Sequence, residues 1–116
     1  MFTQIKLISS LVFALMLFTQ ASAYGACSCP RSYYSTTLIC DHTSSRAYFQ
    51  DSGSCNMMSQ LVNSILYKNK SINEYKCGNS SLWLGSQFVM KFSSDRTCYA
   101  YMSQARSILP SELRGR

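Results

Sequence analysis

The clearest hydrophobic pattern in the chain lies between Ser54 and Lys70. Its apolar residues come in pairs at every fourth position, which places them on one face of an α-helix: Met57, Met58, Leu61, Val62, Ile65 and Leu66. Ser54 and Asn56 are residue types that cap helix N-termini, and Lys68 and Lys70 suit the negative end of the helix dipole. The pattern therefore predicts one amphipathic helix over residues 54–70.

The residues before this helix are rich in aromatic and β-branched side chains, which favour strands. Tyr33 to Cys40 predicts a first strand, and Arg46 to Gln50 predicts its returning partner. Asp41 to Ser45 has the composition of a turn. We therefore expect an N-terminal β-hairpin ahead of the helix.

The residues after the helix predict an antiparallel meander of three to four strands, at 71–77, 82–84, 87–92 and 97–102. The sheet side of the core is expected to comprise Trp83, Phe88, Val89, Met90, Phe92, Tyr99 and Tyr101. Residues 103–109 fit either a short helix or a frayed strand. Residues 110–116 are polar and basic and predict a loose tail. The predicted fold class is α+β: a hairpin, one central helix and a meander.

The first 23 residues have the pattern of a signal peptide. Lys6 precedes an apolar run from Leu11 to Phe18, and Ala-Ser-Ala stands before Tyr24. This run is too short to span a bilayer as a helix of the mature protein. We expect cleavage after Ala23 and secretion of residues 24–116 as one monomeric domain, without stable insertion into a membrane. The alternative is that residues 1–23 are retained as a membrane anchor.

All six cysteines follow the predicted cleavage site: Cys27, Cys29, Cys40, Cys55, Cys77 and Cys98. An even number of cysteines in a small exported domain predicts three disulfides, and the sequence leaves their pairing open. Cys27 and Cys29 are only two positions apart, and we expect them to bond to different partners. The tight Cys27-Ser-Cys29 spacing and the single histidine disfavour a zinc site, and we expect no metal or cofactor.

The formal net charge is +6, with basic residues scattered along the chain. This charge favours contact with anionic surfaces, cell-wall polymers or nucleic acid. Scattered charges are more typical of a generally basic surface than of a dedicated nucleic-acid site.

The hairpin carries the best candidates for a binding surface: Tyr33, Tyr34, Tyr48 and Arg46. Tyrosine rings stack on sugars or bases, but they also pack in strands with one end exposed to water, and the sequence favours packing. Asn69-Lys-Ser71 and Asn79-Ser-Ser81 are glycosylation sequons in predicted loops, so a eukaryotic source would make this a glycoprotein.

Catalytic chemistry has one candidate, His42, which is the only histidine. It is able to serve as a general acid or base, although a histidine in a turn is more often an exposed polar residue. The sequence contains no nucleophile elbow, zinc-protease helix or phosphate loop.

Tyr24-Gly-Ala-Cys27 after a signal peptide, followed by a small basic cysteine-rich domain, resembles the secreted virulence effectors of plant-pathogenic fungi. The order hairpin, helix and meander, with Phe88-Val-Met-Lys-Phe92 before Cys98, is similar to the ribonuclease-like effectors of powdery mildews. The resemblance implies a protein that binds a host protein or RNA, with later uptake into host cells as one route.

Active ribonucleases of this type use a carboxylate base, a histidine acid and an arginine that contacts the phosphate. The resemblance implies Glu74, His42 and Arg96 for these three roles in this sequence. The order of these residues and the single histidine depart from the family, and two residues rather than one separate Tyr24 from Cys27. We therefore expect a non-catalytic secreted interaction protein that binds a host protein, RNA or a cell-wall component. The alternatives are a secreted ribonuclease-like hydrolase and a basic antimicrobial or killer-type toxin.

Overall fold

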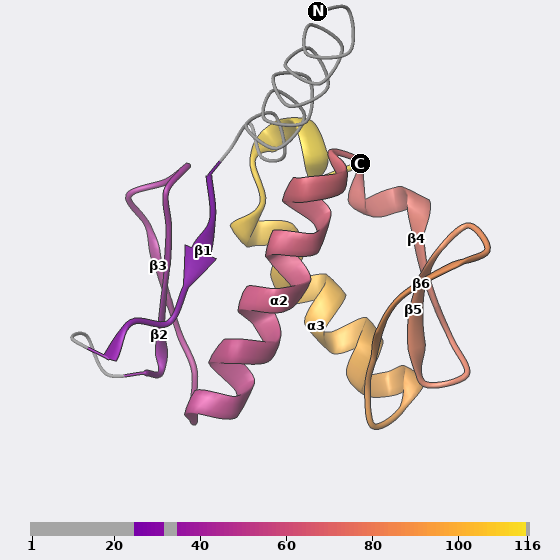
Figure 1. Cartoon of the computed structure of the whole chain (residues 1–116), viewed down its shortest axis with the longest axis horizontal. Helices are drawn as coiled ribbons and strands as arrows, with labels where there is room; N and C mark the ends of the chain where they lie inside the picture. Colours follow the sequence, from indigo (N-terminus) through magenta and orange to yellow (C-terminus); the bar gives the residue numbers. More distant parts are fainter. Residues whose placement is uncertain (1–24, 32–34, 116) are drawn as a thin grey trace, which may run out of the picture.

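A computed structural model describes residues 25–31 and 35–115 (Figure 1). The predicted signal peptide, Tyr33 and Tyr34 lie outside the described residues. The chain forms, in order, β1 (Cys27–Ser28), β2 (Thr37–Cys40), β3 (Arg46–Tyr48), α2 (Ser52–Lys68), the 3-10 helix η2 (Ile72–Glu74), β4 (Tyr75–Gly78), β5 (Ser81–Leu84), β6 (Gln87–Lys91), α3 (Asp95–Ile108) and the 3-10 helix η3 (Ser111–Leu113).

The described strands form two antiparallel sheets, one in the order β1-β2-β3 and the other in the order β4-β5-β6. Figure 1 shows α2 and α3 side by side between these two sheets. The predicted α+β class, the N-terminal hairpin and the three-stranded meander are confirmed.

The predicted central helix is confirmed as α2, but it begins two residues earlier, at Ser52. Asp51 caps it, because its Oδ1 accepts a hydrogen bond from the backbone N–H of Ser54 at 2.7 Å. Asn69, in the left-handed conformation at φ 55°, ends the helix before Lys70. Its buried face comprises Cys55, Met58, Leu61, Val62, Ile65 and Leu66.

The three predicted disulfides are confirmed as Cys27–Cys40, Cys29–Cys55 and Cys77–Cys98. Cys27 and Cys29 bond to different partners, as expected, with Cys27 in β1 and Cys29 just beyond its end. Cys27–Cys40 joins facing residues of β1 and β2, whereas Cys29–Cys55 ties the chain after β1 to the first turn of α2.

Strand β1 is also hydrogen-bonded to α2 through the backbone of Cys27. The Asn63 side chain accepts from the Cys27 N–H at 2.7 Å and donates to the Cys27 carbonyl at 2.8 Å. Ser59 Oγ donates to the same carbonyl at 2.9 Å. Since β1 is an edge strand, these α2 side chains satisfy backbone groups that another strand would otherwise bond.

The strand predicted at 97–102 is wrong, because these residues belong to α3. Ser94 Oγ accepts from the Thr97 N–H at 3.1 Å and caps the helix. Cys98, Met102 and Ala105 are buried at helical spacing, while Tyr99 is 61 % exposed. Burial on one side of the helix therefore outweighs the strand preference of Thr97, Tyr99 and Tyr101.

The second sheet starts later than expected, because η2 occupies the residues before Tyr75. Asn79 and Ser80 both have positive φ angles, 53° and 60°, as a two-residue hairpin turn between β4 and β5 requires. In the predicted sheet core, Phe92 is buried, but Phe88 and Tyr99 are 53 % and 61 % exposed, so the core assignment of these two is wrong.

The C-terminal segment differs from the predicted loose tail. Its residues form η3, Leu113 is buried, and Arg114 Nε donates to the Leu109 carbonyl at 2.7 Å. One buried leucine and one hydrogen bond to a charged donor hold this basic segment against the end of α3.

Replacing Asn63 with alanine should lower the free energy of unfolding by about 1–3 kcal/mol, because the Cys27 N–H loses its partner. Asn56→Ala is the matched control, since Asn56 lies exposed on the same helix and should change stability by less than about 0.5 kcal/mol. Urea unfolding at neutral pH measures both. Equal stabilities of the two variants would contradict the role given to Asn63.

Tyr75 should make the protein less stable at alkaline pH. Burial, with a contribution from Glu74, raises the pKa of Tyr75 to about 12, and its hydroxyl has no hydrogen-bond partner in the described part of the chain. The unfolded tyrosine loses its proton above pH about 10, whereas the folded one holds it, so stability is full below pH 10 and falls through pH 12.

The loss reaches about 3 kcal/mol at most for a shift of this size. Tyr75→Phe should abolish this part of the decline and leave the protein equally stable, or up to about 1 kcal/mol more stable, at pH 7. Denaturant unfolding of both proteins between neutral and alkaline pH measures the difference. Parallel curves for the two proteins would show that Tyr75 is not responsible.

Candidate functional site

A pocket of about 420 Å³ lies between the β2–β3 turn and the C-terminal end of α3. We call it the His42 pocket and define it by the polar side chains in its lining: His42, Thr43, Ser45, Arg46, Ser107, Ser111, Glu112 and Arg114. Its volume falls within the range of small-molecule sites.

The chain closes this pocket by turning sharply after α3. The helix ends at Ile108, and Pro110 then opens η3, which carries Ser111 and Glu112. The hydrogen bond from Arg114 Nε to the Leu109 carbonyl fixes the segment in place. On the opposite wall, Thr43 Oγ1 accepts from the Ser45 N–H at 3.2 Å and shapes the β2–β3 turn.

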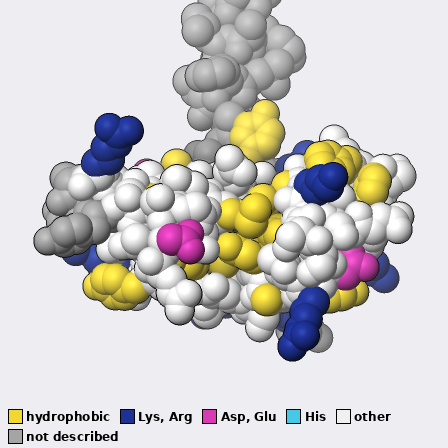
Figure 2. Space-filling view, turned by 90° about the horizontal axis from the view of Figure 1, so that it is seen from below, with side chains coloured by type: hydrophobic (Ala, Val, Ile, Leu, Met, Phe, Trp, Pro, Cys, Tyr) yellow, Lys and Arg dark blue, Asp and Glu magenta, His cyan; other side chains and the backbone are white. Residues whose placement is uncertain are grey.

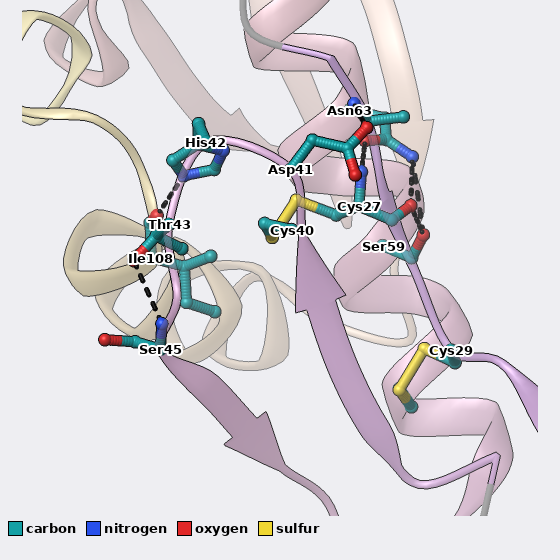
Figure 3. The surroundings of a disulfide bond; sticks show 12 residues. Cys27, Cys29, Cys40, Asp41, His42, Thr43, Ser45, Ser59, Asn63 and Ile108 are labelled. Carbon is teal, nitrogen blue, oxygen red and sulfur yellow. Dashed lines mark hydrogen bonds between the residues drawn. A yellow bond between two sulfur atoms is a disulfide. The ribbon is translucent and has the colours of Figure 1, made fainter. Parts of the chain in front are cut away.

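His42 lines the pocket, and its ring is hydrogen-bonded to the last residue of α3 (Figure 3). Its Nε2 lies 2.8 Å from the Ile108 carbonyl oxygen, and because a carbonyl only accepts, Nε2 is the donor. Its Nδ1 is buried without a hydrogen-bond partner among the described residues, and one of the two ring nitrogens lies within 4.8 Å of the Cys27 and Cys40 sulfurs. Neither ring nitrogen is therefore presented to a ligand in the pocket.

Cys27, Cys40 and His42 bring three potential metal-ligand atoms within 4.8 Å of one another. The two sulfurs are bonded to each other in a disulfide. Metal ions bind thiolates, so this cluster has no sulfur ligand to offer while the disulfide is intact.

The three residues implied by the ribonuclease resemblance do not meet at the His42 pocket. Arg96 lies in the first turn of α3 and His42 contacts its last residue, Ile108, which a rise of 1.5 Å per residue places about 18 Å further along the helix. Glu74 lies in η2 and is exposed. Neither Glu74 nor Arg96 lines the pocket.

The pocket instead gathers one predicted residue, Arg46, with Arg114 and Glu112, which sequence reasoning placed in a loose tail. Asp41, next to His42 in sequence, points elsewhere, because its Oδ2 accepts from the Ala26 N–H at 3.2 Å. The described lining therefore has two guanidinium groups, one carboxylate and several hydroxyls.

The remaining predicted site residues lie outside this pocket. Tyr48 is 72 % exposed on β3. Asn69 and Asn79 are exposed at the end of α2 and in the β4–β5 turn, positions that an enzyme can reach. Glycosylation of either asparagine stays a prediction.

Comparison of the chain with models of protein families, with curated proteins and with solved structures found no match. Within the described residues, none of the helices has the length and apolar character needed to cross a membrane.

Proposed function

We propose that this protein is exported and acts as a non-catalytic interaction protein, which binds an anionic group of its partner in the His42 pocket. The observation that carries the proposal is the environment of the His42 ring, whose two nitrogens are not available to a ligand in the pocket. In the side chain most suited to acid–base catalysis, Nε2 is hydrogen-bonded to the Ile108 carbonyl and Nδ1 is buried, while two arginines line the same pocket.

The composition of the pocket supports an anionic ligand. Guanidinium groups bind carboxylates and phosphates through paired N–H donors, and Arg46 and Arg114 both line the pocket. Hydroxyls of Thr43, Ser45 and Ser107 supply further donors in its lining. Glu112 offsets one positive charge, which favours a single anionic group over a densely charged ligand.

Export is supported by the signal-peptide pattern of residues 1–23 and by three disulfides, which persist in oxidising compartments. The basic net charge of +6 assists encounter with an anionic partner such as an acidic protein surface, RNA or a cell-wall polymer.

A ribonuclease is the second candidate, since Glu112, His42 and an arginine share one pocket. Such an enzyme needs a histidine nitrogen that exchanges protons with the substrate. Here the bond from Nε2 to the Ile108 carbonyl would first have to break, and Nδ1 is buried. The geometry therefore supports binding over hydrolysis.

Titration of the oxidised protein with inorganic phosphate and with an acidic peptide, followed by backbone amide NMR, tests the proposal. We expect shifts confined to the β2–β3 turn and to the end of α3. Arg46→Gln and Arg114→Gln should each weaken binding about tenfold, and raising the salt concentration should weaken it further. Arg96→Gln, the same charge change outside the pocket, should leave affinity unchanged.

Incubation with RNA provides the second arm, in which neither the native protein nor His42→Ala should show turnover. Turnover that disappears in His42→Ala would overturn the non-catalytic proposal. Equal effects of Arg46→Gln and Arg96→Gln on affinity would overturn the placement of the anion site.

A further inference from the structure

A second hollow, of about 320 Å³, lies between the end of β3, the start of α2 and the middle of α3. We call it the aromatic groove and define it by its principal lining side chains: Tyr48, Phe49, Gln50, Ser54, Tyr101 and Gln104. Figure 2 views the molecule from the end at which α2 begins, and it shows hydrophobic side chains gathered in a central hollow of that face.

The rings of the groove are held by the fold on both sides. The Phe49 N–H donates to the Thr36 carbonyl at 2.9 Å, which fixes the chain between β3 and α2. Tyr101 packs against buried Phe92, with ring centroids 5.5 Å apart. Tyr48, by contrast, is 72 % exposed. The lining thus combines rings that the fold holds in place with an exposed tyrosine that a ligand can reach.

No charged side chain lines the groove among the described residues, although the protein has a net charge of +6. Asp51 lies beside it in sequence, but its Oδ1 accepts from the Ser54 N–H at the start of α2. A ligand with phosphates or carboxylates would find no cation in this lining, which disfavours nucleic acid and acidic peptides. The groove therefore suits a neutral ligand.

The polar groups of the lining narrow the ligand class further. The side-chain amides of Gln50 and Gln104 and the hydroxyl of Ser54 each donate and accept hydrogen bonds. Sugar hydroxyls have the same dual character, and the apolar faces of sugar rings stack on aromatic side chains. A proline-rich peptide also packs on aromatic rings, but its backbone carbonyls only accept.

We propose that the aromatic groove binds a neutral oligosaccharide, with a sugar ring stacked on Tyr48. This site and the His42 pocket have different lining residues. The groove suits a neutral ligand, whereas the pocket suits an anionic one. Arg46, two residues before Tyr48, lines the His42 pocket and not the groove. A failure to bind anions in the His42 pocket would therefore leave the saccharide proposal unaffected, and the reverse also holds.

Isothermal titration with three neutral hexasaccharides, cellohexaose, laminarihexaose and chitohexaose, tests the inference, with amide NMR to locate the site. At least one of them should bind and shift the amides of Tyr48 to Gln50 and of Ala100 to Gln104. Tyr48→Ala should weaken this binding about 5- to 100-fold, the range expected for loss of one stacked ring.

Tyr67→Ala is the matched control, because Tyr67 is 63 % exposed on α2 and does not line the groove. It should leave affinity unchanged, as should Arg46→Gln and higher salt, since no charge takes part. Both tyrosines are exposed, so both variants should fold, which amide spectra will verify.

Three results would overturn the inference. One is the absence of binding by all three sugars at about 10 mM, near the weak limit of specific recognition. Another is an equal loss of affinity in Tyr48→Ala and Tyr67→Ala. The third is tighter binding of a proline-rich peptide, which would assign the groove to a protein partner.

Discussion

The attachment of β1 to α2 is the constraint on which the rest of the N-terminal half depends. Asn63 pairs with both backbone groups of Cys27, and Cys29–Cys55 covalently fixes the chain one residue beyond β1. The strand is only two residues long, so its pairing with β2 would be weak without these bonds. The first sheet is therefore attached to α2 through its edge strand β1.

This attachment also determines where the functional residues lie. Cys27–Cys40 holds β2 against β1, and His42 follows Cys40 by two residues. The His42 ring therefore meets the end of α3, where the Ile108 carbonyl accepts a hydrogen bond from Nε2, and the pocket forms beside it. His42 thus links the β2–β3 turn to the end of α3, and the proposed anion binding depends on the arginines.

The two proposed sites share β3 and α3 but differ in chemistry. Arg46 lines the His42 pocket, whereas Tyr48 lines the aromatic groove. On α3, Ser107 belongs to the pocket and Gln104, three residues earlier, belongs to the groove. A short strand and one helix thus contribute to both proposed sites, one lined by two arginines and the other without charged side chains among the described residues.

Helix α2 could be predicted because its buried residues repeat every four positions, and the disulfides because six cysteines share a small domain. Helix α3 was missed because Thr97, Tyr99 and Tyr101 favour strands locally. Its signal was the cap at Ser94 with apolar residues at Cys98, Met102 and Ala105. His42 and Arg46 were recognisable as residue types.

Their partners were not recognisable, since Ile108 lies 66 positions beyond His42 and Arg114 is folded back by a buried leucine. Such long-range contacts depend on tertiary packing rather than on local pattern.

Mapping the disulfides of the oxidised protein by mass spectrometry tests the central claim most directly. Partial reduction with stepwise alkylation is needed, because one residue separates Cys27 from Cys29. The account predicts Cys27–Cys40, Cys29–Cys55 and Cys77–Cys98. A Cys27–Cys55 bond, or free thiols at Cys29 and Cys55, would contradict the attachment of β1 to α2.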